Sequence, residues 1–306
     1  MALKHVIIGG GTGYIGSCIA TALSTLKPPL SVRTTIISRM PGPNRMSWQE
    51  LEINGLPKDT TAVINVAGQN ILDFTQRWTP GFKQNVYNSR VKTTKQLAEA
   101  ISNSDVKTFI TISGVAYYPP DRNEYTEYDQ CKKYDFLSEL CHDWECAAEL
   151  PKDSSTRQIT IRSGVVLGRT GGMIKQVIMP FFFGLGGPIG SGTQYMPWIH
   201  IRDLVNLFLH ALQNECVRGI YNGVAPELVT NAEFTKAFAS ALGRPAFIPL
   251  PEFALKTLLN EERAKIMLEG QKVIPKRVLE SNFQYKYPTI KRACEEFAWV
   301  RYEEPY

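Results

Sequence analysis

Three glycines near the start of the chain, Gly10, Gly13 and Gly16, have the spacing of a phosphate-binding turn. They follow the apolar run of residues 3–8, and the last of them lies at the start of residues 14–26, so we predict a buried strand, a tight turn and a helix. Free backbone N–H groups at the start of such a helix point at an anion, and glycine lets the main chain approach a pyrophosphate closely. The alternative is a glycine-rich turn that binds nothing.

Ser38 and Arg39 follow a β-branched run at residues 33–38, which we predict to be the second strand. In a dinucleotide fold the end of this strand faces the adenosine ribose. An acidic residue there favours a free 2′-hydroxyl, whereas arginine accommodates a 2′-phosphate. No acid occurs until Glu50, so the sequence predicts NADP rather than NAD. The alternative is that Arg39 is a solvated loop cation.

Strand and helix patterns alternate through the first half of the chain. After the strand at residues 33–38, further strands are expected at residues 61–67, 107–113 and 158–162, and helices at residues 89–103 and 136–150. This alternation implies right-handed crossovers and a parallel sheet covered on both faces. We therefore predict an α/β, doubly wound (Rossmann) fold.

The second half has a different composition. Residues 181–192 contain five glycines, which favours a mobile or ligand-covering loop: Gly184, Gly186, Gly187, Gly190 and Gly192. Helices are expected at residues 231–242, capped by Thr230, and at residues 253–269. We predict a Rossmann domain at 1–167 with 195–225 returning to the sheet, a glycine-rich substrate loop at 168–194, and a smaller, mainly helical region at 226–306.

The composition excludes several other classes. The net charge of +5 comes from 34 basic and 29 acidic residues without a basic block, so no nucleic-acid partner is expected. The apolar runs are too short to span a bilayer, and no membrane partner is expected. The six cysteines show neither a CxxC pair nor histidines at metal spacing, so neither disulfides nor a metal are expected. With the first strand so close to the N-terminus, a leader peptide is not expected and the cytoplasm is the expected compartment.

Several motifs together resemble one family. They are the glycine turn, Ser38-Arg39, residues 62–70, Arg77-Trp78, residues 185–192, 198–201 and 230–234, and the LEGQKVIPKR stretch at 268–277. The chain resembles the "epimerase family" proteins, atypical members of the extended short-chain dehydrogenase/reductase superfamily, over essentially its whole length. The resemblance implies an NADP-binding Rossmann domain and a smaller C-terminal region over a cleft for a small-molecule substrate. It does not decide whether the chain forms a homo-oligomer.

The resemblance also assigns cofactor contacts by position. It places Ser38 and Arg39 at the 2′-phosphate, and it implies further contacts from Gly10, Gly13, Tyr14, Ile15, Gly16, Val66, Ala67, Asn85, Arg90 and Val166. Pure core packing is the alternative for the two valines and Ala67. A surface helix is the alternative for Asn85 and Arg90, where Arg90 replaces an asparagine of extended relatives.

Relatives that move hydride use a serine, a tyrosine and a lysine, with the tyrosine as acid/base. Ser113 ends its strand, and Tyr128 and Lys132 have the spacing of four that a helix requires. They nevertheless precede the helix, and aligning on the helix itself leaves residues 135–141 with neither tyrosine nor lysine. Two adjacent tyrosines near Ser113 are possible substitutes: Tyr117 and Tyr118.

His200 and Asp203 correspond to the segment that returns to the sheet in extended relatives. A packing role is the simpler interpretation for His200, and Asp203 is a candidate cap for a helix at residues 204–213. Three hypotheses follow for the whole chain: an NADP-dependent oxidoreductase or epimerase, a non-catalytic NADP(H)-binding regulator that lacks the Tyr–Lys pair, or a fold of this class without a dinucleotide.

Overall fold

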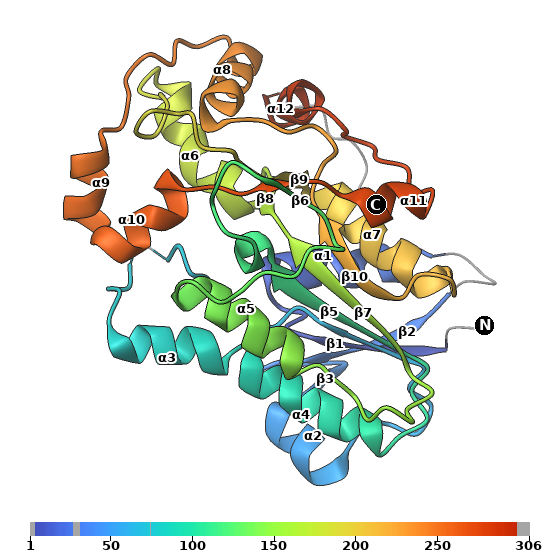
Figure 1. The fold of residues 1–306 in the computed structure, drawn as a ribbon. Coiled ribbons are helices and arrows are strands. Elements are labelled where there is room, and N and C mark those ends of the chain that lie inside the picture. The colour runs from blue at the N-terminus through green and yellow to red at the C-terminus, as the bar shows by residue number, and fades with distance from the viewer. Residues whose placement is uncertain (1–3, 27–30, 74, 299–306) are drawn as a thin grey trace.

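The computed structural model of the chain describes residues 4–26, 31–73 and 75–298. Its centre is a seven-stranded parallel sheet with the order β10-β7-β5-β4-β1-β2-β3 (Figure 1). The strands are β1 His5–Gly9, β2 Arg33–Ile37, β3 Arg45–Met46, β4 Ala62–Asn65, β5 Thr108–Gly114, β7 Arg157–Ser163 and β10 Gly219–Gly223. This confirms the predicted doubly wound α/β fold. Leu3, which the sequence places in the first strand, lies outside the described residues.

Alternate residues of the central strands face two helical layers, as the period of a strand requires. On one face, Val6 and Ile8 of β1 pack with Ile19 of α1 Tyr14–Ser24 and Leu204 of α7 Ile201–Gln213. On the other face, Ile7 packs with Leu97 and Ile101 of α4 Val91–Ser102, near α2 Trp48–Asn54. Both faces of the sheet are therefore buried.

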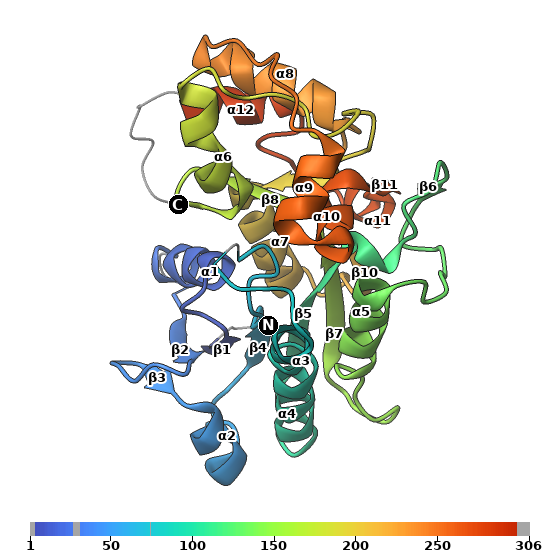
Figure 2. The ribbon, with the colours of Figure 1, turned by 90° about the vertical axis from the view of Figure 1, so that its left-hand side faces the viewer.

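A smaller, helical lobe has its own apolar core. Its elements are β8 Val165–Gly168, α6 Gly172–Phe182, β9 Trp198–His200, α8 Asn231–Leu242, α9 Glu252–Leu259, α10 Glu261–Leu268 and α12 Ile290–Ala298. Trp198, Phe234, Phe238 and Phe297 are buried together in this core. Figure 2 shows α6, α8, α9 and α10 gathered at one end of the sheet, above α1 and α3 Pro80–Asn88.

Asp203 attaches the C-terminal segment to the sheet layer and does not cap α7. Its buried carboxylate accepts hydrogen bonds from Lys286 N (2.7 Å) and Tyr287 N (2.8 Å). The N-cap of α7 is His200, whose Nδ1 accepts from Arg202 N at 3.1 Å. The His200 ring is stacked on Tyr287, with centroids 3.8 Å apart. Both side chains therefore hold the lobe in place.

The predicted helix at residues 253–269 is wrong in one respect: it is two helices. Asn260 has φ 69° and separates α9 from α10, where its side chain accepts from Arg263 N. Arg263 is buried and donates to three carbonyls of the loop after β4, namely Ile71, Asp73 and Gln76, at 2.6–2.7 Å. The break between the two helices therefore lets α10 contact that loop through Arg263.

The glycine-rich segment forms a bonded ribbon. Leu250 N donates to Pro188 O and Gly190 N donates to Leu250 O, each at 2.9 Å. Ile248 N also donates to Gly186 O, at 3.3 Å. Residues 186–190 and 248–250 thus lie side by side, and the preceding helix α6 extends to Phe182.

Candidate functional site

Each glycine of the turn after β1 is required for a different reason. Gly10 has φ +76°, and a Cβ there would lie 2.6 Å from Ala67 Cα. A Cβ at Gly16 would lie 2.4 Å from Gly10 O. At Gly13, the N-cap of α1, a Cβ would meet only Gly10 O, at 3.3 Å. Gly10 and Gly16 therefore let the turn close, while Gly13 leaves its outer side open to a ligand.

The start of α1 is suited to an anion. Its first turn carries no acidic side chain, and the first N–H groups of a helix have no partner within the helix. Tyr14, the first helical residue, packs its ring against the backbone of Gly168 and Gly171 at the start of α6. Ile15 is half-buried against the main core. The turn is thus held between the sheet and the lobe.

Ser38 and Arg39 lie at the carboxyl end of β2, next to the glycine turn. Ser38 is buried, its hydroxyl lies 3.3 Å from the Thr12 hydroxyl, and it accepts from Met40 N at 3.0 Å. Arg39 is exposed and forms no ion pair with a described residue. Two hydroxyls therefore meet at the end of β2, and the next residue supplies an exposed guanidinium, a combination that suits a ribose phosphate.

Buried Asn65 shapes the carboxyl end of β4. Its side chain donates to Thr94 Oγ1 at 2.8 Å and accepts from Ala67 N at 3.1 Å. Val66 is half-buried, and its N–H donates to Gly9 O at 2.9 Å. Val66 and Ala67 thus continue the strand edge beside Gly10. Val166 lies in β8, opposite Ile199 of β9.

Ser113, at the carboxyl end of β5, has an unusual environment. It is buried, and its Oγ makes no hydrogen bond of ordinary geometry with a described residue, although the Cys141 thiol lies close enough to interact with it. The helix facing it, α5 Phe136–Cys146, presents the Cys141 thiol, which would lie 3.3 Å from a Cβ at Gly114. Burial raises the pKa of Cys141 to about 12, so the thiol is protonated at neutral pH. The hydroxyl is therefore available to a bound group.

Thiol reagents are expected to modify two cysteines rapidly. Cys146 and Cys216 are exposed, whereas Cys18 and Cys131 are half-buried and should react more slowly. Cys141 and Cys294 are buried, and burial raises the pKa of each of these two thiols to about 12. Because the thiolate is the nucleophile, an aromatic disulfide reagent at pH 8 should release about two rapid equivalents from the native protein. Cys141→Ser should leave this rapid fraction unchanged, and a fall of one equivalent would contradict the buried position.

Tyr128 and Lys132 do not meet Ser113 on a helix face. Residues 126–135 are not helical, so the spacing of four does not align the two side chains. Tyr128 is 60% exposed, and its hydroxyl donates to Glu280 Oε2 at 2.7 Å. The helix that packs against Ser113 is α5, and it contains neither tyrosine nor lysine.

Tyr117 and Tyr118 are held by packing. Arg162 Cζ lies 3.3 Å from the Tyr117 ring centroid, and the His142 ring is stacked on Tyr117 with centroids 4.3 Å apart. The Tyr118 hydroxyl is buried, donates to Asn222 Oδ1 at 2.9 Å and accepts from Arg162 Nη1 at 2.8 Å. Burial raises the pKa of Tyr118 to about 12. Tyr118 is thus fixed in a buried network.

Arg90 is buried although it follows a surface helix. It is the N-cap of α4, and its guanidinium donates to Val86 O at 3.1 Å and Gln69 O at 2.9 Å. Its Cζ lies 5.2 Å from the Trp144 ring centroid and would lie 3.1 Å from a Cβ at Gly68. Asn85, in α3, is exposed. The two predicted contacts therefore occupy different environments.

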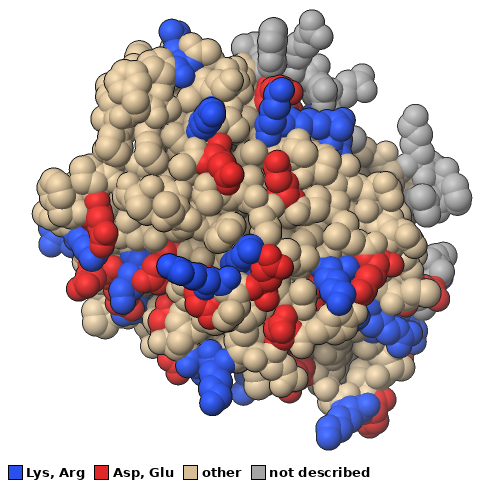
Figure 3. Space-filling view, turned by 45° about the horizontal axis from the view of Figure 1, so that its top comes forward, with Lys and Arg blue, Asp and Glu red and all other residues tan. Residues whose placement is uncertain are grey.

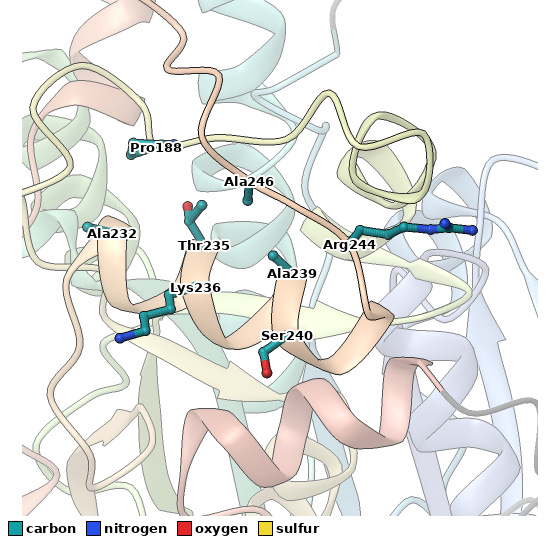
Figure 4. Close-up of a pocket in the computed structure, with 8 residues that line it drawn as sticks. All are labelled: Pro188, Ala232, Thr235, Lys236, Ala239, Ser240, Arg244 and Ala246. Atoms are coloured by element: carbon teal, nitrogen blue, oxygen red, sulfur yellow. The ribbon is translucent and has the colours of Figure 1, made fainter.

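A pocket of ≈440 Å³ lies apart from this edge, along α8 (Figure 4). Its lining combines small side chains with Lys236 and Arg244, which point away from each other. On the face shown in Figure 3, basic and acidic side chains are interspersed, and no large patch of one sign is visible. No described helix is long and apolar enough to cross a membrane.

Three residues of this edge escaped the sequence analysis: Thr12, Asn65 and Cys141. Thr12 stands between two glycines of the turn, a position from which a hydroxyl could have been expected to reach the phosphate region. Asn65 is a polar residue inside an apolar strand, which signals a buried hydrogen bond. Cys141 carries no such signal, because nothing in its neighbours indicates that it faces Ser113.

The doubly wound sheet, with a glycine turn where the strand order reverses between β1 and β4, defines a Rossmann-type nucleotide-binding protein. Within this class, the chain belongs to the NAD dependent epimerase/dehydratase family, whose model matches residues 6–222. Residues 250–297 match a second family, "Domain of unknown function (DUF1731)". The family confirms the resemblance inferred from the motifs.

Relatives match over nearly the whole chain. Epimerase family protein SDR39U1 of Homo sapiens is 48% identical over 295 residues, covering 95% of this chain and 99% of the relative. A chloroplastic homolog from Arabidopsis thaliana is 36% identical over 299 residues, covering 94% of this chain and 85% of the relative.

Solved structures agree with the fold. The crystal structure of human epimerase family protein SDR39U1 (isoform2) with NADPH has a TM-score of 0.92 and 47% identity, covering 96% of this chain and 99% of that chain. UDP-glucuronic acid 4-epimerase from Bacillus cereus, in complex with UDP-glucuronic acid and NAD, has a TM-score of 0.75 and 15% identity, covering 96% and 98%. At that identity the likeness is one of fold alone.

Proposed function

We propose that this chain binds NADP(H) across the carboxyl edge of the sheet and that cofactor occupancy is its primary function. The observation that carries the proposal is the contact of the Thr12 and Ser38 hydroxyls at the end of β2, with Arg39 next in the chain, beside a glycine turn whose Gly13 has an open side. Hydroxyls and a free guanidinium suit a 2′-phosphate, and no acidic side chain in the first turn of α1 opposes the pyrophosphate. The human relative crystallised with NADPH supports the same cofactor.

The residues of α5 indicate how the bound cofactor is used. Bound NADP(H) supplies hydride chemistry at its nicotinamide ring. In short-chain dehydrogenases a tyrosine on the helix facing the strand-end serine moves the proton, but here that helix offers Cys141 beside Ser113. The Cys141 thiol keeps its proton at neutral pH, and Tyr128 bonds Glu280 instead. We therefore favour a regulatory NADP(H)-binding protein. We place it in a reducing compartment such as the cytoplasm, which suits six cysteines that form no disulfide in the described chain.

A second candidate is an oxidoreductase or epimerase that acts on a small molecule. It is favoured by Ser113, whose buried hydroxyl has only the weakly bonding Cys141 thiol beside it and can donate to a carbonyl oxygen. An unpaired buried hydroxyl costs about 1–3 kcal/mol, so a ligand that satisfies it gains affinity. Ser113 would then orient the substrate, and the proton would come from a group other than Tyr128.

Binding and turnover distinguish the two candidates. We expect NADPH to bind, Tyr128→Phe to leave its affinity unchanged, and no member of a carbonyl library to oxidise bound NADPH. Oxidation that is lost in Ser113→Ala would establish the second candidate. Fluorescence titration with NADPH and absorbance at its reduced-ring band give the two readouts. If NADPH does not bind the folded chain, both candidates fail.

A further inference from the structure

We infer that Arg90 makes this site selective for the reduced cofactor, NADPH, over NADP⁺. The inference rests on the proposed function, and it concerns the oxidation state of the ligand rather than its phosphate. It follows from the position of one buried guanidinium, from the absence of a carboxylate beside it in the described chain, and from the charge of the nicotinamide ring.

The position follows from the order of the strands. Ser38 and Arg39 at the end of β2 fix the adenosine half, and Gly13 fixes the pyrophosphate. The nicotinamide half then extends in the opposite direction, over the carboxyl ends of β4 and β5. Gly68 follows β4 and packs against the Arg90 guanidinium, and Ser113 ends β5. Arg90 therefore lies beside the part of the sheet edge over which the nicotinamide half would extend.

The charge of Arg90 has no counter-charge among the described residues. Its two hydrogen bonds go to main-chain carbonyls, of Val86 and Gln69. A carbonyl dipole solvates a cation but does not neutralise it. Burial lowers the pKa of Arg90 to about 10, so the guanidinium stays charged at neutral pH and retains an unfavourable buried charge.

The groups on the facing helix do not change this balance. Glu145 of α5 forms two hydrogen bonds with Arg162, both at 2.8 Å. Asp143 accepts from Lys133 at 2.7 Å. Cys141 is the residue of α5 whose negative charge, if it ionised, would act on Arg90. It is a neutral thiol, because burial raises its pKa to about 12. Of the two buried guanidinium groups at this part of the sheet edge, Arg162 is thus paired with a carboxylate and Arg90 is not.

A positive charge at this position affects the two oxidation states differently. The oxidised nicotinamide ring is a cation, whereas the reduced ring is neutral. At an effective dielectric constant of about 20, two like charges held in one site repel enough to change affinity by an order of magnitude or more. Both forms keep the same phosphates, so this repulsion appears as a ratio of dissociation constants.

The wild-type chain gives the first test, by calorimetric titration at 0.15 M salt. We expect NADPH to bind at least about tenfold more tightly than NADP⁺, which for a two-electron couple corresponds to about 30 mV in the potential of the bound cofactor. We also expect NADP⁺ to bind no better than 2′-phospho-ADP-ribose, which lacks the ring. Equal affinities for NADPH and NADP⁺ would overturn the inference while leaving the proposed function intact, whereas failure of all three ligands would overturn the proposed function.

Variants then assign the effect to Arg90. Arg90→Gln removes the charge and should bring the two affinities within about threefold, and Arg90→Lys should keep the wild-type ratio. Arg39→Gln is the matched control, because loss of a cation at the phosphate end should weaken both forms equally. If folded Arg90→Gln keeps the wild-type ratio of the NADP⁺ and NADPH dissociation constants, the inference is wrong. If Arg90→Gln does not fold, the comparison with 2′-phospho-ADP-ribose decides.

Discussion

Arg39→Ala is expected to lower NADPH affinity about ten- to a hundredfold while leaving the weaker affinity for NADH unchanged. A charge-assisted hydrogen bond to a phosphate contributes about 1.5–3 kcal/mol, and Arg39 has no described ion pair that would have to break first. Because the side chain is exposed, its removal should leave the free energy of unfolding unchanged. Titration of both cofactors against both proteins measures the effect as a change in their affinity ratio.

The dependence of cofactor affinity on ionic strength gives a second test of Arg39. The wild-type preference for NADPH should decline as ionic strength rises, because an exposed guanidinium is screened, whereas the residual preference of Arg39→Ala should depend less on salt. Arg45→Ala is a suitable control, since Arg45 is also exposed but donates to Pro41 O. Equal affinity of the wild type for NADPH and NADH, with no change in Arg39→Ala, would show that Ser38 and Arg39 do not read the 2′-phosphate.

The elements that depend on neighbouring residues could be predicted from the sequence. The first strand, glycine turn and helix are encoded within two dozen consecutive residues, and α1 begins at the predicted Tyr14. The helix at residues 231–242 has the predicted bounds, because Thr230 and Glu233 form a capping box that depends only on their spacing. Where propensity and capping agree, tertiary contacts add little to the assignment.

The remainder depends on partners that are distant in sequence. The break at Asn260 accompanies the contacts of Arg263 with a loop almost 190 residues earlier. Tyr128 and Lys132 have a suggestive spacing, but the Tyr128 hydroxyl bonds Glu280, 152 residues away. For Arg90 the sequence offers a cofactor contact or a surface helix, and nothing local to it indicates that Gly68 and Trp144 bury its side chain. In each case the deciding contact leaves no local pattern.

The second large effect is expected at the glycine turn, where two alanine substitutions should separate folding from binding. In Gly16→Ala the new Cβ would lie 2.4 Å from Gly10 O, so the turn or the start of α1 must move. Forcing a methyl into a packed site costs about 1–3 kcal/mol. We therefore expect Gly16→Ala to lose stability in urea unfolding and to lose NADPH binding together.

Gly13→Ala is expected to keep the stability and lose the ligand. Gly13 has φ −75°, which any residue adopts, and its new Cβ would meet only Gly10 O, at 3.3 Å, so a shift of a few tenths of an ångström suffices. The methyl would instead occupy the open side of the turn, where a pyrophosphate must approach the main chain. NADPH affinity should fall by at least about tenfold with an unfolding midpoint close to that of the wild type. If Gly13→Ala binds NADPH normally, the open side of Gly13 is not the approach to the pyrophosphate, and the turn holds the cofactor through the N–H groups of α1 alone.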